Sequence, residues 1–181
     1  MSAEQVSPRT DAEPLAFTAD EFLRGTVASW IAFNVLFGPT LAVIGSLTTA
    51  PGWGPSWSVT AIVLIYVVPI ALVASGVVTL LCCGAAWLLG RVLRRRRAFA
   101  LHAICFALLG AAIGTLVVVV YTLAVDAPMS LANPIAALAI ACSAAALPLG
   151  WVWTVRRSMR VEAGRSKPPR IDPDAAFEDV F

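Results

Sequence analysis

Charge is scarce in this sequence. Only 13% of its 181 residues are Asp, Glu, Lys or Arg, about half the share of a typical soluble domain. Four long stretches contain none of them: 26–47, 59–89, 98–125 and 131–155. Ion and proton pathways, and catalytic acid–base sets, normally need ionisable groups inside the protein. The absence therefore argues against a proton-coupled pump and predicts that the protein is not an enzyme.

Potential metal and redox ligands are also few. The chain has one histidine and four cysteines, and every cysteine falls inside an apolar stretch, so no disulfide framework is indicated. Imidazole and thiolate bind zinc or copper. His102 and Cys105 lie three positions apart on one helical face, and Cys82 and Cys83 precede the same turn. Buried cysteines usually act as small hydrophobes, so we expect no metal or cofactor and keep these four as weak candidates.

Apolar residues make up 59% of the chain, and the mean hydropathy is +0.83. Each uncharged stretch exceeds the roughly 18 residues that mark a membrane span. The sequence therefore predicts an all-α integral membrane protein, with four transmembrane helices in an up-down bundle. The expected spans are about 26–47, 59–89, 98–125 and 131–155, within a domain at 19–155.

Basic residues predict the orientation of these spans. The five segments outside the spans carry 2, 0, 5, 0 and 6 Lys and Arg residues. Because basic residues concentrate on the cytoplasmic side, both termini should be cytoplasmic. Residues 1–18 should be a disordered cytoplasmic N-terminus without the basic start of a signal peptide. Residues 156–181 should form a cytoplasmic tail, first basic and then acidic.

Two helix starts and one irregular span are also indicated. Thr18 and Glu21 have the spacing of a capping box, which predicts a helix beginning near Ala19. Asn133 and Pro134 should cap the start of the fourth span. The second apolar stretch, Val59 to Leu89, would be about 46 Å long as a helix, against a hydrocarbon core of about 30 Å. It must tilt, kink at Pro69 or protrude from the membrane.

Small residues indicate where the helices pack. Gly110 and Gly114 form a GxxxG pair in the third span, and Ala103 and Ala107 extend it on nearly the same face. Small residues four positions apart let helix backbones approach closely in lipid. The face could pack within this chain's bundle, or it could contact a partner or a second copy. Asn34, the one amide deep in a span, should form a hydrogen bond between helices.

Two segments outside the spans, one basic and one acidic, suggest surface contacts. The run Arg94, Arg95, Arg96 and Arg97 holds its turn in the cytoplasm and should also bind anionic lipid headgroups. A tight turn offers no base-reading surface, so we expect no nucleic-acid partner. At the C-terminus, an acidic and aromatic segment could dock on a partner. Its apolar residues are Phe177, Val180 and Phe181.

These features favour a non-enzymatic accessory or scaffold subunit that acts through helix packing and its C-terminal tail. A membrane protein partner or a homo-oligomer would be the expected assembly. A small transporter or channel component, with Asn34, Pro39 and Pro69 shaping a path, is the alternative. Arginine outnumbers lysine twelve to one, which is typical of GC-rich bacterial genomes and suggests the bacterial cytoplasmic membrane.

Overall fold

Every long element in the described part of the chain is a helix. The computed structural model describes residues 18–47, 57–93, 95–96, 98–125 and 133–165, and this part of the chain contains no strand. The elements in chain order are α1 (Ala19–Leu47), α2 (Trp57–Ile62), η1 (Val63–Val67), α3 (Val68–Leu93), α4 (Phe99–Val125) and α5 (Pro134–Arg165).

Four of these helical stretches are long and apolar enough to cross a membrane. Their bounds are Ala19–Ser46, Thr60–Leu93, Phe99–Val125 and Pro134–Val161. Helices suit this environment because each satisfies its own backbone hydrogen bonds where no water is available. The prediction of an all-α chain with four helices long and apolar enough to span a membrane is confirmed for the described residues, and these helices are compatible with a multi-pass membrane protein.

The helix starts follow the local sequence signals. The Thr18 amide donates to the Glu21 carboxylate, and the Glu21 amide donates to the Thr18 hydroxyl, both at 3.2 Å. This reciprocal pair is the predicted capping box, and α1 begins at Ala19. At α5, the Ile135 amide donates to the Asn133 side-chain oxygen at 2.9 Å, with Pro134 in the first helical position. Both predicted caps are confirmed.

The second span contains a change of helix type. It passes from α2 through the π-helix η1 into α3, and Pro69 follows η1 by two residues. A proline donates no backbone hydrogen bond, and a wider π turn is one way in which a helix accommodates the defect. A Cβ added to Gly38 on α1 would lie 3.7 Å from the side chain of Val68. The span thus remains helical from Trp57 to Leu93 rather than ending at Leu89.

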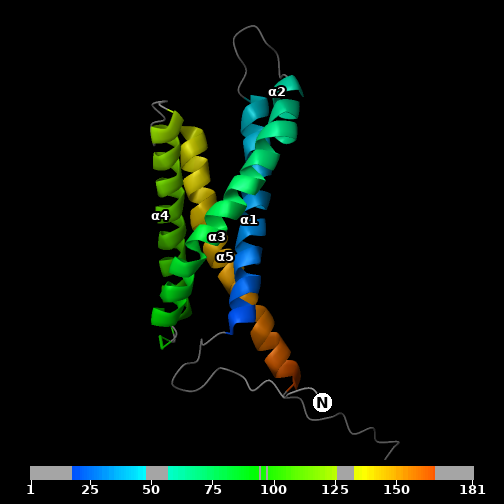
Figure 1. Ribbon diagram of the computed structural model, residues 1–181. Coiled ribbons are helices and arrows are strands. Elements are labelled where there is room, and N and C mark those ends of the chain that lie inside the picture. The colour runs from blue at the N-terminus through cyan, green and yellow to red at the C-terminus, as the bar shows by residue number, and fades with distance from the viewer. Residues whose placement is uncertain (1–17, 48–56, 94, 97, 126–132, 166–181) are drawn as a thin grey trace, which may run out of the picture.

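Helix α5 lies at the centre of the arrangement, because α1 and α4 both pack along its length. Helix α3 contacts α1 and α4 much less, and Figure 1 shows it leaning across the other helices. Contacts between chain positions show that α1 is antiparallel to α3 and to α5. Phe22 meets Trp87 while Trp30 meets Ser75, and Gly25 meets Thr154. The core therefore consists of three helices, with α3 at its side.

Helix α5 continues past the expected end of the fourth span. We placed that end at Val155 and expected a separate tail from Arg156, but the helix runs to Arg165. Ten additional residues extend it by about 15 Å. Figure 1 shows this segment projecting beyond the other helices. The fall in hydropathy marks where a span leaves lipid, and it does not mark where helical geometry stops.

The capping box at the start of α1 can be tested directly. Thr18→Ala removes the hydroxyl that accepts from the Glu21 amide, which should cost about 1 kcal/mol of local helix stability. Hydrogen exchange in nanodiscs should show faster exchange of the amides at residues 20–22 in this variant. Thr18→Ser keeps the hydroxyl and should exchange like the parent. Equal exchange in both variants would contradict the role given to this cap.

Candidate functional site

Two glycines of α4 allow its closest approach to α5. A Cβ atom added to Gly114 would lie 2.9 Å from the Cα of Ile140, and one added to Gly110 would overlap the carbonyl of Ser143. Both glycines are buried. The structure therefore places the GxxxG pair against this chain's own α5. The other two residues of that face are half-buried on α4: Ala103 and Ala107.

A second close approach joins α1 to α5. A Cβ on Gly25 would lie 3.1 Å from the hydroxyl oxygen of Thr154, and one on Gly150 would overlap Ser29. Our reading of the sequence did not single out this contact. Its signal was present, because Gly25 and Ser29 are four positions apart, as are Gly150 and Thr154. Small residues at this spacing on two spans are the pattern of closely packed membrane helices.

A polar cluster fastens α3 to α1. The Asn34 amide nitrogen and the Trp30 indole nitrogen each donate to the hydroxyl of Ser75 at 3.1 Å. The indole also lies 3.3 Å from the carbonyl oxygen of Leu72, and the Asn34 amide donates to the Trp30 carbonyl at 2.8 Å. The predicted helix–helix hydrogen bond of Asn34 is confirmed. This cluster is the main polar link between α3 and the three-helix core in the described residues.

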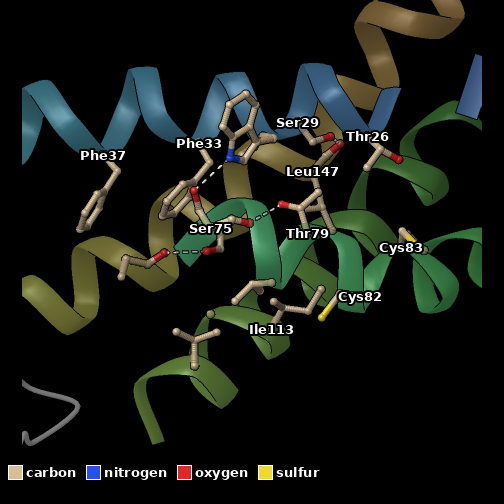
Figure 2. Close-up of a pocket in the computed structure, with 18 of the residues that line it drawn as sticks. Thr26, Ser29, Phe33, Phe37, Ser75, Thr79, Cys82, Cys83, Ile113 and Leu147 are labelled. Carbon is tan, nitrogen blue, oxygen red and sulfur yellow. Dashed lines mark hydrogen bonds between the residues drawn. The ribbon is translucent and has the colours of Figure 1, made fainter. Parts of the chain in front are cut away.

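A long groove separates α3 from the core on either side of this cluster. Its volume is about 560 Å³, and residues of α1, α3, α4 and α5 line it. Along α1 it runs from Glu21 to Phe37. Figure 2 shows the lining side chains converging from the four helices, with Phe33 and Phe37 on one wall and Ile113 on another. Nearly all of the lining is apolar.

Most hydroxyl groups along the groove are already engaged. Each of five donates to the carbonyl of the residue four positions earlier on its own helix, at 2.7 to 3.0 Å. They are Thr26, Ser29, Thr79, Ser143 and Thr154. Such bonds are common in membrane helices, where no water is available to accept a hydrogen bond from the hydroxyl. The groove therefore suits an apolar guest rather than a polar one.

His102 is placed in an aromatic environment. It is only 2% exposed, and its ring stacks on Trp151 with centroids 5.2 Å apart. Nδ1 lies 3.1 Å from the Ala98 carbonyl, which it can reach only as a donor, and Nε2 has no hydrogen-bond partner. Phe99 and Phe106 also contact the Trp151 ring. The histidine thus serves as part of the packing between α4 and α5.

The cysteine candidates do not gather around this histidine. Cys82, Cys83 and Cys105 are half-buried free thiols, and Cys83 donates to the carbonyl of Leu80 at 2.9 Å. Within the described residues, no three His, Cys, Asp or Glu side chains come together in a way that could hold a metal ion. Cys82 and Cys83 instead line the groove.

The basic turn lies between α3 and α4. Arg95 and Arg96 are exposed, and the Arg96 amide donates to the Leu93 carbonyl at 2.8 Å, which closes the turn. Arg94 and Arg97 lie outside the described residues, as do the predicted docking residues Phe177, Val180 and Phe181. The exposed guanidinium groups of this turn are accessible to charged surroundings.

The chain matches no protein-family model, no curated protein and no solved structure. The arguments on function consequently rest on geometry and chemistry alone.

The α4–α5 contact predicts a strong effect of added bulk. Gly114→Leu would force a side chain into the backbone of Ile140, and overpacking of this kind typically costs about 1–3 kcal/mol. Its thermal unfolding midpoint in detergent should fall clearly below that of the parent. Ala112→Leu adds similar bulk to an exposed face of the same helix and should change little. Equal midpoints for the two variants would mean that α4 and α5 do not meet at Gly114.

The polar cluster predicts a coupling between Asn34 and Ser75. A double-mutant cycle of Asn34→Ala and Ser75→Ala should give an interaction energy of about 0.6 kcal/mol, the usual value for hydrogen bonds between membrane helices. Reversible unfolding in mixed micelles supplies the four free energies of unfolding. Thr79→Ala is the control, because its hydroxyl bonds only within α3. A cycle with Asn34 and Thr79 should show no coupling, and a zero value for Asn34 with Ser75 would refute the contact.

Proposed function

We propose that this protein is a non-enzymatic accessory or scaffold subunit of a membrane complex, and that α3 is the helix it offers to a partner. The partner would be a transmembrane helix of another membrane protein. The proposal rests on one observation, the incomplete packing of α3 within its own chain. In its most apolar 18-residue window, none of the residues of this span is buried, whereas 22% are buried in each of the other three.

The side of α3 that faces away from the groove forms a continuous apolar ridge. Val73 is 66% exposed, Leu80 72% and Leu88 63%, and Val77 lies between them on the same side. Gly84 is at the centre of this ridge. These positions recur at spacings of three and four residues, the pattern with which one helix meets another.

Gly84 is the feature that favours a helix over fluid lipid as the neighbour. A Cβ added there would meet nothing within 4 Å, so no contact inside the described chain requires a glycine. Glycine in a helix costs about 1 kcal/mol relative to alanine in water. The missing side chain of Gly84 leaves a notch in the surface of α3. A disordered acyl chain gains few contacts from such a notch, whereas an approaching helix backbone or bulky side chain gains close packing contacts.

The shape of the notch favours a different protein over a second copy. Leu80 and Leu88 stand one turn before and one turn after Gly84. In a two-fold contact centred here, the exposed Leu80 and Leu88 side chains of the two copies would meet on either side of Gly84 and hold the backbones apart, because an isologous interface uses the same surface of both copies. A large side chain from an unrelated helix would fill the notch instead.

The orientation of the protein belongs to the same proposal. The antiparallel helix pairs bring the start of α1, the arginine turn and the end of α5 to one end, where nearly all basic residues of the described chain lie. The basic distribution supports an up-down bundle with cytoplasmic termini. The excess of arginine over lysine favours the bacterial cytoplasmic membrane. Anionic headgroups would contact the arginine turn, and the Phe177–Phe181 segment would offer a second docking contact. We propose no nucleic-acid partner.

The alternative of a small transporter or channel receives less support. A path for polar solutes needs groups that can replace water around the solute. Along the groove the hydroxyls bond to their own helices, and the amide of Asn34 bonds to Trp30 and Ser75. This arrangement favours the accessory role over conduction.

Site-specific photo-crosslinking in intact membranes tests the proposal. A photoreactive phenylalanine derivative at Leu80 should give an adduct with one membrane protein. The same group at Leu108, equally exposed on α4, should not give it. Gly84→Leu fills the notch and should reduce the Leu80 adduct about tenfold, the effect of about 1.4 kcal/mol of lost packing.

Ala112→Leu is the matched control, since it adds bulk to the exposed face of α4 and should leave the adduct unchanged. An adduct whose mass equals two copies of the chain would replace the proposed partner with a homo-oligomer. The proposal fails if Leu80 and Leu108 give the same products, or if Gly84→Leu and Ala112→Leu behave alike.

A further inference from the structure

We propose that the groove between α3 and the three-helix core holds one acyl chain of a phospholipid, whose phosphate lies beside Arg91. This site uses the inner face of α3, whereas the proposed partner helix uses the outer face. The two proposals are therefore independent. Four features of the groove support the inference: its dimensions, its lining, the arginine at its basic end and its access from the surrounding lipid.

The dimensions favour a slender guest. Glu21 and Phe37 are sixteen positions apart on α1, so the groove follows the helix for about 24 Å. Its volume of about 560 Å³ lies within the range of small-molecule sites. An extended hydrocarbon chain matches this length.

The lining favours hydrocarbon over water or a polar solute. The groove passes between aromatic and aliphatic side chains, including Phe33, Phe37 and Ile113. The nearby hydroxyls and amides are bonded to protein groups, so few donors remain for a guest. Apolar cavities of this kind stay dry and take up apolar molecules. Inside a bilayer, acyl chains are the apolar molecules at hand, and they gain dispersion contacts with the lining where they fit it closely.

The mouth of the groove at the basic end provides a site for a phosphate. Phe22 lines the groove there and makes an edge contact with Trp87, with centroids 4.9 Å apart. The guanidinium of Arg91 lies 5.4 Å from the centre of the same indole ring and is exposed. Arginine is well suited to phosphate because it presents several donors in a planar fork. The nearby Glu21 carboxylate accepts from the Thr18 amide at the helix start.

The groove is open to the surrounding lipid. Ile70 and Ala74 of α3 line it and are also exposed on the outer surface. Contacts between α3 and α4 are sparse, so a chain can enter sideways from the bilayer. A phospholipid can thus place its headgroup at Arg91 while its acyl chain lies between the helices.

Native mass measurement on the full chain tests the site. The protein is reconstituted in vesicles of phosphatidylethanolamine and phosphatidylglycerol, re-extracted in mild detergent and measured. The parent should carry one phospholipid per chain that persists as detergent removes the loosely held lipids. Ala74→Trp fills the groove and should lower the ratio of lipid-bound to lipid-free protein about tenfold, the effect of about 1.4 kcal/mol of lost packing.

Val73→Trp is the matched control, because Val73 is the neighbouring residue and faces away from the groove. Its ratio should equal that of the parent. Ala74→Leu adds less bulk and should give an intermediate ratio, so the series remains interpretable if the tryptophan variant folds poorly. Lipid-free parent protein, or equal ratios for Ala74→Trp and Val73→Trp, would overturn the proposal.

A substitution at Arg91 separates the contact with the lipid phosphate from the contact with the acyl chain. Arg91→Gln removes the guanidinium and should lower the lipid-bound ratio, while Arg156→Gln on α5 should not. Equal ratios for these two variants would refute the phosphate contact at Arg91. A dimer that carries no lipid would show that a helix of a second copy occupies the groove, and it would overturn the inference.

Discussion

Close backbone approach along α5 is the contact on which the rest of the structure depends. In lipid, helices gain nothing from removing apolar surface from water, so dispersion and shape fit decide which faces meet. Helix α5 approaches α4 where Gly110 and Gly114 lack side chains, and it approaches α1 at Gly25 and Gly150. These glycines keep the three helices together at distances that larger residues would prevent. Helix α3 has no comparable contact, and its different position follows from that.

Much of the local structure could be predicted from the sequence, because local signals act within a few residues. The capping box of Thr18 and Glu21 and the Asn133 cap are of this kind, and the spans follow from length and lack of charge. Which face of each helix packs against its neighbours could not be predicted equally well. In soluble helices an apolar stripe identifies the core, but these helices are apolar all round. Small residues identified the face of Gly114, while Gly25 was overlooked and nothing local revealed that α3 would stand apart.

Hydropathy also explains why two helix ends differ from their predicted positions. The second span runs to Leu93 and the last helix to Arg165, each past the first arginine after its uncharged stretch. Arginine is a good helix former, and its long side chain can keep its charge in water while the backbone continues. Hydropathy reports the solvent around a segment, and hydrogen bonding reports its geometry. The polar cluster at Ser75 and the groove around it depend on tertiary contacts, so they became visible only in the folded chain.

The unbroken course of α5 has a mechanical consequence. One continuous helix passes through the core and extends about 15 Å beyond Val155, where Arg156, Arg157 and Arg160 are exposed. Pro148 lies inside this helix, and because a proline removes one backbone hydrogen bond, the helix bends most easily there. A force applied to the projecting end would therefore move the part of α5 that packs on α1 at Gly150 more than the part that packs on α4 at Ser143. Such a lever would change the spacing between the helices of the core.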